Sequence, residues 1–207
     1  MNNVNIKILR LIPMNKTHLL SGLLVLSSLL MPAQAQVAST KVYNTGKAIE
    51  KPLIMSRFIE MQSARSVPEV MFTDTKGKQI SLKQYKGKLV LVNLWATWCA
   101  PCIKEIPQME NIRQVNKNND LVVVPISIDE ESDKVQAFLE RHELGHYQTW
   151  LDPKKTIDQI MPADVVPATY VFDGSGNLVG FLRGYLDWGD KEVQPYLEKL
   201  TAKYAKR

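Results

Sequence analysis

Near-continuous runs of apolar residues predict the central strands of one β-sheet. Leu89–Trp95 is interrupted only by Asn93, and Leu121–Ile128 is rich in β-branched residues. Both patterns are typical of strands that are covered on both faces. Ala168–Phe172 and Leu178–Arg183 flank a glycine-rich turn segment, an arrangement that predicts a hairpin.

Helical patterns alternate with these runs. Helices are predicted from Pro101 to about Asn116, from the capping residues Asp129–Ser132 to about Leu144, and from about Asp190 to Tyr204. Smaller elements are predicted as a hairpin of Val70–Phe72 and Gln79–Ser81, a short strand at Tyr147–Leu151 and a short helix near Lys154–Ile160. The alternation implies parallel strands joined by crossover helices, and the last hairpin adds an antiparallel edge. The predicted fold class is therefore α/β, with a mixed central sheet flanked by helices.

Residues 1–35 have the pattern of a signal peptide. Basic residues precede an uncharged apolar run, Leu19–Met31, and the small-x-small sequence Ala33-Gln34-Ala35 follows Pro32. The run is shorter than the roughly 20 residues that a membrane-spanning helix needs. We therefore predict export to the periplasm with cleavage after Ala35, and the alternative is an uncleaved N-terminal membrane anchor. Residues 36–65 lack a clear period and are interpreted as a linker or N-terminal arm, with a single domain at 66–207.

The net charge of the chain does not indicate a different class of function. The sequence pI is about 9.1, a value that could indicate a nucleic-acid-binding protein. Residues 1–35, however, hold three of the 26 basic side chains and none of the 21 acidic ones, which leaves 23 basic against 21 acidic residues. The basic excess thus belongs mostly to the signal segment, and no nucleic-acid partner is predicted.

The only two cysteines, Cys99 and Cys102, form a C-x-x-C pair between a predicted strand and a predicted helix. In an exported chain without other cysteines this spacing indicates a redox pair. Cys99 would lie at the helix N-terminus, where free N–H groups and the helix dipole stabilise a thiolate, the nucleophilic form. Cys102 would lie one turn later and could resolve a mixed disulfide, and Pro101 suits the first helical turn. This chemistry needs no cofactor.

A second motif, His142-Glu143-Leu144-Gly145-His146, matches the H-E-x-x-H pattern of zinc proteases. That mechanism needs both histidines on one helical face and a third ligand. The helical pattern stops near Gly145, and no further histidine follows the signal segment. We therefore predict no metal site.

The sequence around the cysteines resembles the thioredoxin superfamily, and within it the exported TlpA/ResA-like branch. The resemblance covers about Val67 to Lys203 and rests on Trp98-Cys99-Ala100-Pro101-Cys102, Pro107, Val166-Pro167-Ala168-Thr169, Gly184 and Trp188. It implies a thioredoxin-like fold with an N-terminal hairpin and a helix–strand insert from Glu131 to Leu151. It also implies that Pro167 is cis and lies against the disulfide, and that Trp98, Ala100, Pro101, Val166 and Pro167 contact the substrate.

The same resemblance draws attention to two polar positions. Asn93 stands where thioredoxin carries a buried acid that moves the proton of the second cysteine, so that route is absent here. Glu105 matches a glutamate that ResA-like members have near the active site, and it is a candidate proton acceptor for Cys102. The alternative is a solvated carboxylate on the first turns of the helix.

The function predicted from these features is reduction of disulfides in client proteins that carry cysteine pairs. By resemblance, the clients would be apocytochrome c or copper-delivery and oxidase-assembly proteins, and a membrane thiol donor of the DsbD or CcdA type would restore the dithiol. The dipeptide Ala100-Pro101 lacks the histidine of strongly oxidising members, which favours a low reduction potential. The alternatives are a net thiol oxidase or isomerase and a thioredoxin-fold copper chaperone.

Overall fold

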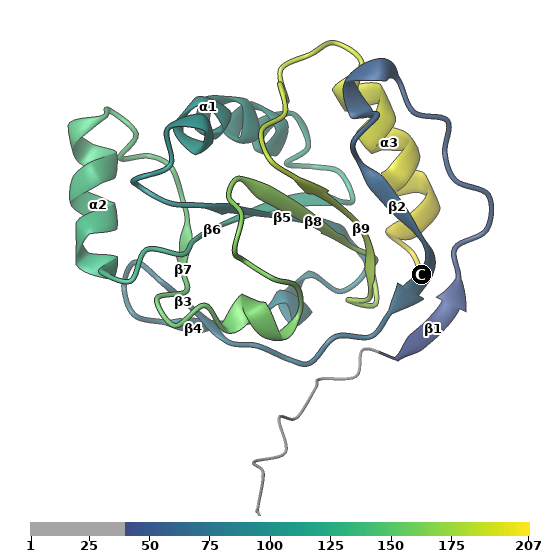
Figure 1. The fold of residues 1–207 in the computed structure, drawn as a ribbon, viewed down its shortest axis with the longest axis horizontal. Coiled ribbons are helices and arrows are strands. Elements are labelled where there is room, and N and C mark those ends of the chain that lie inside the picture. The colour runs from purple at the N-terminus through teal and green to yellow at the C-terminus, as the bar shows by residue number, and fades with distance from the viewer. Residues whose placement is uncertain (1–39) are drawn as a thin grey trace, which may run out of the picture. The chain divides into compact units, whose positions relative to one another are not determined.

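The computed structural model describes residues 40–207, which form one nine-stranded sheet with helices packed on it (Figure 1). The strand order is β1-β2-β9-β8-β5-β6-β7-β3-β4. Within this part of the chain, no helix combines the length and the apolar character needed to cross a membrane. The predicted signal peptide and its cleavage site lie outside the described residues.

The centre of the sheet has the predicted strands. β5 (Leu89–Trp95) runs parallel to β6 (Leu121–Ser127) and antiparallel to β8 (Ala168–Phe172). β9 (Leu178–Arg183) continues from β8 as a hairpin. All seven residues of β5 are buried, because a central strand has neighbours on both edges and packed side chains on both faces.

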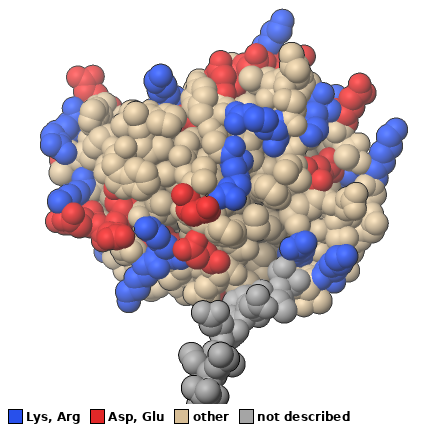
Figure 2. Space-filling model, in the orientation of Figure 1, with Lys and Arg blue, Asp and Glu red and all other residues tan. Residues whose placement is uncertain are grey.

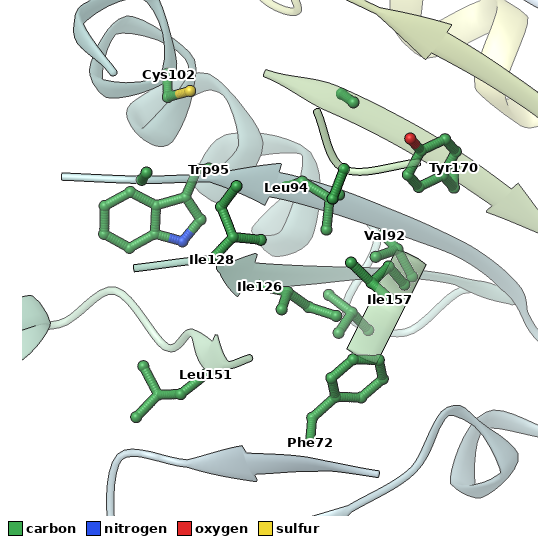
Figure 3. Packing of buried hydrophobic residues seen from close by; sticks show 14 of the residues in the cluster. Phe72, Val92, Leu94, Trp95, Cys102, Ile126, Ile128, Leu151, Ile157 and Tyr170 are labelled. Carbon is green, nitrogen blue, oxygen red and sulfur yellow. The ribbon is translucent and has the colours of Figure 1, made fainter. Parts of the chain in front are cut away.

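Alternate residues of β5 enter two separate hydrophobic clusters. Val90, Val92 and Leu94 pack with α2 (Ser132–Arg141). That cluster also holds both cysteines, and Figure 3 shows part of it, with Cys102 of α1 at its margin. On the other face, Leu89 and Leu91 pack with buried residues of α1 (Ala100–Val115) and α3 (Val193–Tyr204). Helix α1 thus has buried residues in both clusters.

The smaller elements are present, but their bounds are shorter than predicted or, for the first strand of the hairpin, shifted by two residues from the predicted Val70–Phe72. β3 (Phe72–Asp74) and β4 (Gln79–Ile80) form the predicted hairpin, β7 is only Trp150–Leu151, and the short helix is a 3₁₀ turn, Thr156–Gln159. α2 ends at Arg141, before the predicted end at Leu144. Pro195 falls in the first turn of α3, where a missing N–H costs nothing because that N–H has no partner inside the helix.

Of the two interpretations of residues 36–65, the described part of the segment is an N-terminal arm and not a linker. β1 (Lys41–Asn44) pairs with β2 (Ile59–Arg65), and β2 pairs with β9, so the segment adds two strands to the sheet. The 3₁₀ turn Leu53–Met55 precedes β2, and the side chains of Met55 and Phe58 are almost fully buried. They join the cluster beneath α3, where the Phe58 ring meets Tyr196 edge to face at a centroid distance of 5.9 Å.

Docking of this arm depends on a missing side chain in β9. Gly180 is buried opposite Glu60 of β2. A Cβ atom added to Gly180 would lie 2.5 Å from the Phe58 ring and 2.9 Å from the Ile59 carbonyl oxygen. Because one of these atoms belongs to the backbone, the added methyl group could be accommodated only by moving the strand.

We predict that Gly180→Ala destabilises the protein by about 1–3 kcal/mol, the usual cost of overpacking a well-packed site. The measurement is urea unfolding of the oxidised protein. Gly145→Ala is the matched control, because its added methyl group would meet nothing closer than 3.9 Å, and its effect should stay within about 0.5 kcal/mol. Equal free energies of unfolding for the two variants would contradict the docking of β2 on β9.

Candidate active site

The loop between β5 and α1 is fixed by hydrogen bonds from a neighbouring strand end. Asp129, which follows β6, accepts bonds from the Thr97 N–H at 2.9 Å and from the Thr97 hydroxyl at 2.7 Å. The Ser127 hydroxyl donates to the same carboxylate at 2.8 Å. Trp95 at the end of β5 is fully buried, as expected for a strand that is covered on both faces. The chain therefore reaches Cys99 in one defined conformation.

Cys99 is the N-cap residue of α1. Its Sγ atom accepts a hydrogen bond from the Cys102 N–H at 3.2 Å, one of the free donors at the helix N-terminus. The two cysteines form a disulfide with a Cα–Cα distance of 5.2 Å. Cys99 thus occupies the position where helix N–H groups and the dipole favour a thiolate once the disulfide is reduced.

Both cysteines are nearly covered by protein, whereas the residues around them are not. Cys99 and Cys102 are 4% and 1% exposed, respectively, while Trp98 is 67% exposed. Ala100 and Pro101, between the cysteines, are exposed as well. The disulfide is therefore framed by side chains that face solvent.

The Val166-Pro167 loop belongs to the same region of the fold. Its peptide bond is cis, as expected from the resemblance. Val166 packs against the hydrophobic cluster that contains both cysteines, and Pro167 is buried. The Pro167 carbonyl accepts a hydrogen bond from the Gly184 N–H at 2.7 Å, so this loop is tied to the turn that follows β9.

Glu105 is not a solvated helix carboxylate, because it is only 1% exposed. Its Oε1 atom accepts a hydrogen bond from the Leu186 N–H at 2.8 Å, and its Oε2 atom accepts one from the Asn93 amide at 3.2 Å. The Asn93 amide also donates to the Thr169 hydroxyl at 3.1 Å. The carboxyl group is thus held by α1, β5 and the turn after β9.

Burial raises the pKa of Glu105 from 4.5 to about 7. The hydrogen bonds from Leu186 and Asn93 lower it again in part, and so does the positive charge of Arg57. The buried Trp188 indole N–H has no partner at hydrogen-bond geometry among the described residues, yet it lies near enough to Glu105 to lower the pKa further. Desolvation nevertheless dominates, and the carboxyl group can exchange a proton near neutral pH.

Two residues of the site have roles that their local sequence does not predict. Asp129 was treated only as a helix cap, although its place after a strand parallel to β5 puts it at the edge of the sheet where α1 begins. Arg57 lies in the segment 36–65, for which the sequence predicts a linker or N-terminal arm.

The H-E-x-x-H motif begins where α2 has already ended, at Arg141, and His142 packs on the Phe138 ring at a centroid distance of 4.2 Å.

The raised pKa of Glu105 predicts a pH-dependent stability. Between pH 4.5 and about 7 the folded chain binds the carboxyl proton of Glu105 more tightly than the unfolded chain does. This tighter binding stabilises the folded state, and its contribution is fully present below pH 4.5. It is lost as the pH rises through 7, and the loss is about 3 kcal/mol. Urea unfolding of the oxidised protein from pH 4.5 to 8 should show this decline in the wild type and not in Glu105→Gln.

Glu198→Gln, which changes an exposed glutamate of α3, is the control and should retain the wild-type pH dependence. Parallel stability profiles for the wild type and Glu105→Gln would show that Glu105 does not titrate in this range.

Comparisons with known proteins agree with this site. Residues 64–180 match the AhpC/TSA family. The ResA thiol-disulfide oxidoreductase of Bacillus cereus is 30% identical over 142 residues, which cover 69% of this chain and 80% of that protein.

Solved structures show the same fold. A secreted thiol-disulfide isomerase from Corynebacterium glutamicum superposes with a TM-score of 0.58 at 21% identity, over 79% of this chain and 98% of the other. A DsbF homologue from Corynebacterium diphtheriae has a TM-score of 0.56 at 24% identity, over 73% and 96% of the two chains. The fold is therefore thioredoxin-like. The chain belongs to the AhpC/TSA family and, within it, to the branch of the ResA thiol-disulfide oxidoreductases, with Cys99 and Cys102 as its redox pair.

Proposed function

We propose that the protein is an exported reductase of disulfides in client proteins. The Cys99 thiolate attacks one sulfur of the client disulfide and forms a mixed disulfide, and the second client sulfur leaves as a thiolate. The Cys102 thiolate then attacks the Cys99 sulfur and releases the other client sulfur. The client gains two electrons, and the protein ends with the Cys99–Cys102 disulfide. The N-cap position of Cys99, where its Sγ accepts the Cys102 N–H bond, is the observation that carries this assignment of roles.

Glu105 is proposed as the group that accepts the Cys102 proton in the second step. It lies three residues after Cys102 on the same helix, it is buried, and burial raises its pKa to about 7. A base with a pKa near the working pH combines an available unprotonated form with a useful affinity for the proton. Asn93 holds the carboxylate through its amide and does not itself titrate.

The reducing direction is supported by the residues between the cysteines. Ala100 and Pro101 carry no charge and no side-chain hydrogen-bond donor, so neither stabilises the Cys99 thiolate. In the strong oxidant DsbA, stabilisation of the reduced form raises the potential to about −120 mV, compared with about −270 mV for thioredoxin. In this protein the Cys99 thiolate is stabilised mainly by the helix N-terminus. Its reduction potential should therefore lie nearer that of thioredoxin, about −270 mV.

Protein clients are supported by exposed apolar side chains next to Cys99, in the loop before Pro167 and in the turn bonded to that loop. Trp98 is 67% exposed, Val165 in the loop before Pro167 is 40% exposed, and Tyr185 after Gly184 is 37% exposed. Exposed apolar side chains close to a reactive site favour binding of another polypeptide. Trp98, Ala100, Pro101, Val166 and Pro167 are accordingly proposed as client contacts.

The proposed place of action is supported by the sequence of residues 1–35 and by one relative, and the proposed partners come from the resemblance to the TlpA/ResA-like branch. The signal-like pattern ends at Ala35, and the Corynebacterium glutamicum relative is a secreted protein. We therefore propose action in the periplasm on cysteine pairs of apocytochrome c or of copper-delivery and oxidase-assembly proteins. A membrane thiol donor of the DsbD or CcdA type would return the two electrons.

The test is trapping of clients in the native host with Cys102→Ser, which lacks the resolving thiol. We predict that this variant accumulates mixed disulfides through Cys99 with exported proteins that contain cysteine pairs. Cys99→Ser is the matched control and should trap none. The direction of electron flow is then read from a strain without the protein, in which the same client cysteines should remain oxidised. Clients that are fully reduced in that strain would make the protein an oxidase and contradict the proposal.

A further inference from the structure

The turn that follows β9 connects three parts of the active site. The Gly184 N–H donates to the Pro167 carbonyl at 2.7 Å, and the Leu186 N–H donates to Glu105 at 2.8 Å. The carbonyl between them, that of Tyr185, accepts a hydrogen bond from Arg57. The position of this turn therefore sets the position of the N–H group that holds the Glu105 carboxylate.

Arg57 comes from the N-terminal arm. It lies between the 3₁₀ turn Leu53–Met55 and β2, 128 residues before the carbonyl that it binds. It also lies outside residues 64–180, which match the AhpC/TSA family. The family match therefore covers Glu105 and Pro167, whereas Arg57 and the Gly184–Leu186 turn lie on either side of it.

Residue 184 is glycine, and the absence of a side chain leaves room for the Arg57 guanidinium group beside the turn. Gly184 has a φ of +85°, a conformation that favours glycine. A Cβ atom on this residue would approach an Arg57 guanidinium nitrogen to 3.3 Å. The guanidinium group therefore packs closely over the turn as well as donating to its carbonyl.

The arm holds the base of Arg57 in place, although the side chain itself is exposed. The neighbouring Phe58 and the preceding Met55 are almost fully buried. The Lys51 ammonium group donates to the Ser56 carbonyl at 3.1 Å and to the Phe58 carbonyl at 2.8 Å. Arg57 thus extends from a backbone segment that is fixed on both sides.

We propose that Arg57 is a positioning residue of the active site, which holds the Gly184–Leu186 turn so that the Leu186 N–H stays on the Glu105 carboxylate. The consequence for disulfide exchange rests on the proposed role of Glu105 as proton acceptor. The placement of Arg57 itself rests only on the contacts of Arg57, the turn and Glu105.

The charged and titratable groups near Glu105 determine whether its pKa rises or falls when Arg57 is replaced. Arg57 is the cation that lowers its pKa, Tyr147 is a titratable group that interacts with its charge, and Cys102, one helical turn earlier in α1, does not titrate in the oxidised protein. Removing Arg57 takes away a positive charge and loosens the turn that supplies the Leu186 N–H. Both changes disfavour the carboxylate and raise the pKa of Glu105.

The experiment is a carboxyl-carbon NMR titration of Glu105 in the oxidised full-length protein, which does not depend on catalysis. We predict that Arg57→Gln raises the pKa of Glu105 by about half a pH unit or more. Arg57→Lys, which keeps the charge, should lie nearer the wild type. Arg65→Gln removes an exposed cation from the far end of β2 and should leave the titration unchanged. An Arg57→Gln titration that coincides with the wild type would overturn the proposal.

A second readout separates this inference from the proposed function. The rate at which Cys102 resolves a mixed disulfide with a model peptide is measured from pH 5 to 9 in the wild type and in Arg57→Gln. If Arg57→Gln shifts both the rate profile and the NMR titration to higher pH, the positioning role of Arg57 and the role of Glu105 as proton acceptor are both supported. If the titration moves and the rate profile does not, Arg57 still positions Glu105 and the role of Glu105 as proton acceptor is wrong. If Glu105→Gln changes the rate profile while Arg57→Gln changes neither measurement, only the inference about Arg57 fails.

Discussion

The start of α1 directly after a buried strand is the constraint on which the rest of the active site depends. β5 is buried along its whole length, so the position of its last residue is fixed by the sheet. Asp129 then holds Thr97, and Cys99 caps the helix with its sulfur on the Cys102 N–H. A sulfur in that position faces the positive end of the helix dipole without help from any charged side chain between the cysteines. The environment that favours a Cys99 thiolate is therefore a property of the strand–helix junction.

The Glu105 carboxyl joins this junction to distant parts of the chain. The glutamate is carried by α1, and its two oxygens bind Asn93 of β5 and the Leu186 N–H after β9. Burial without a direct ion pair raises its pKa to about 7, whereas a solvated glutamate is almost fully ionised at neutral pH. The turn that provides the Leu186 N–H is in turn bonded to Pro167 and to Arg57. The Val166-Pro167 loop, the buried acid and the N-terminal arm are thus linked by hydrogen bonds through this one turn.

The sequence was sufficient for the parts of the fold that follow from local patterns. β5, β8 and β9 have the predicted bounds because their apolar runs end at clear turn signals. The redox pair was found because its spacing, the preceding strand and Pro101 all indicate a helix start. Glu105 could be selected only through the resemblance to ResA-like proteins, since its burial depends on elements far away in the chain.

The N-terminal arm was missed for a physical reason. β2 has little regular alternation of buried and exposed residues, and the arm is anchored instead by Met55 and Phe58 outside the strand. The room for Phe58 is created by Gly180, and the contact of Arg57 exists only once β9 has brought its turn alongside. Such tertiary contacts leave no periodic signal in the sequence.

The central claim, that the strand–helix junction makes Cys99 the attacking thiol, is tested most directly by alkylation of the reduced protein. Iodoacetamide is added in limiting amount at pH 7, and the modified cysteine is identified by mass spectrometry. The account predicts that Cys99 is modified first, because its sulfur lies at the helix N-terminus and the Cys102 side chain is more deeply covered. Modification of Cys102 first, or of both cysteines at equal rates, would contradict it.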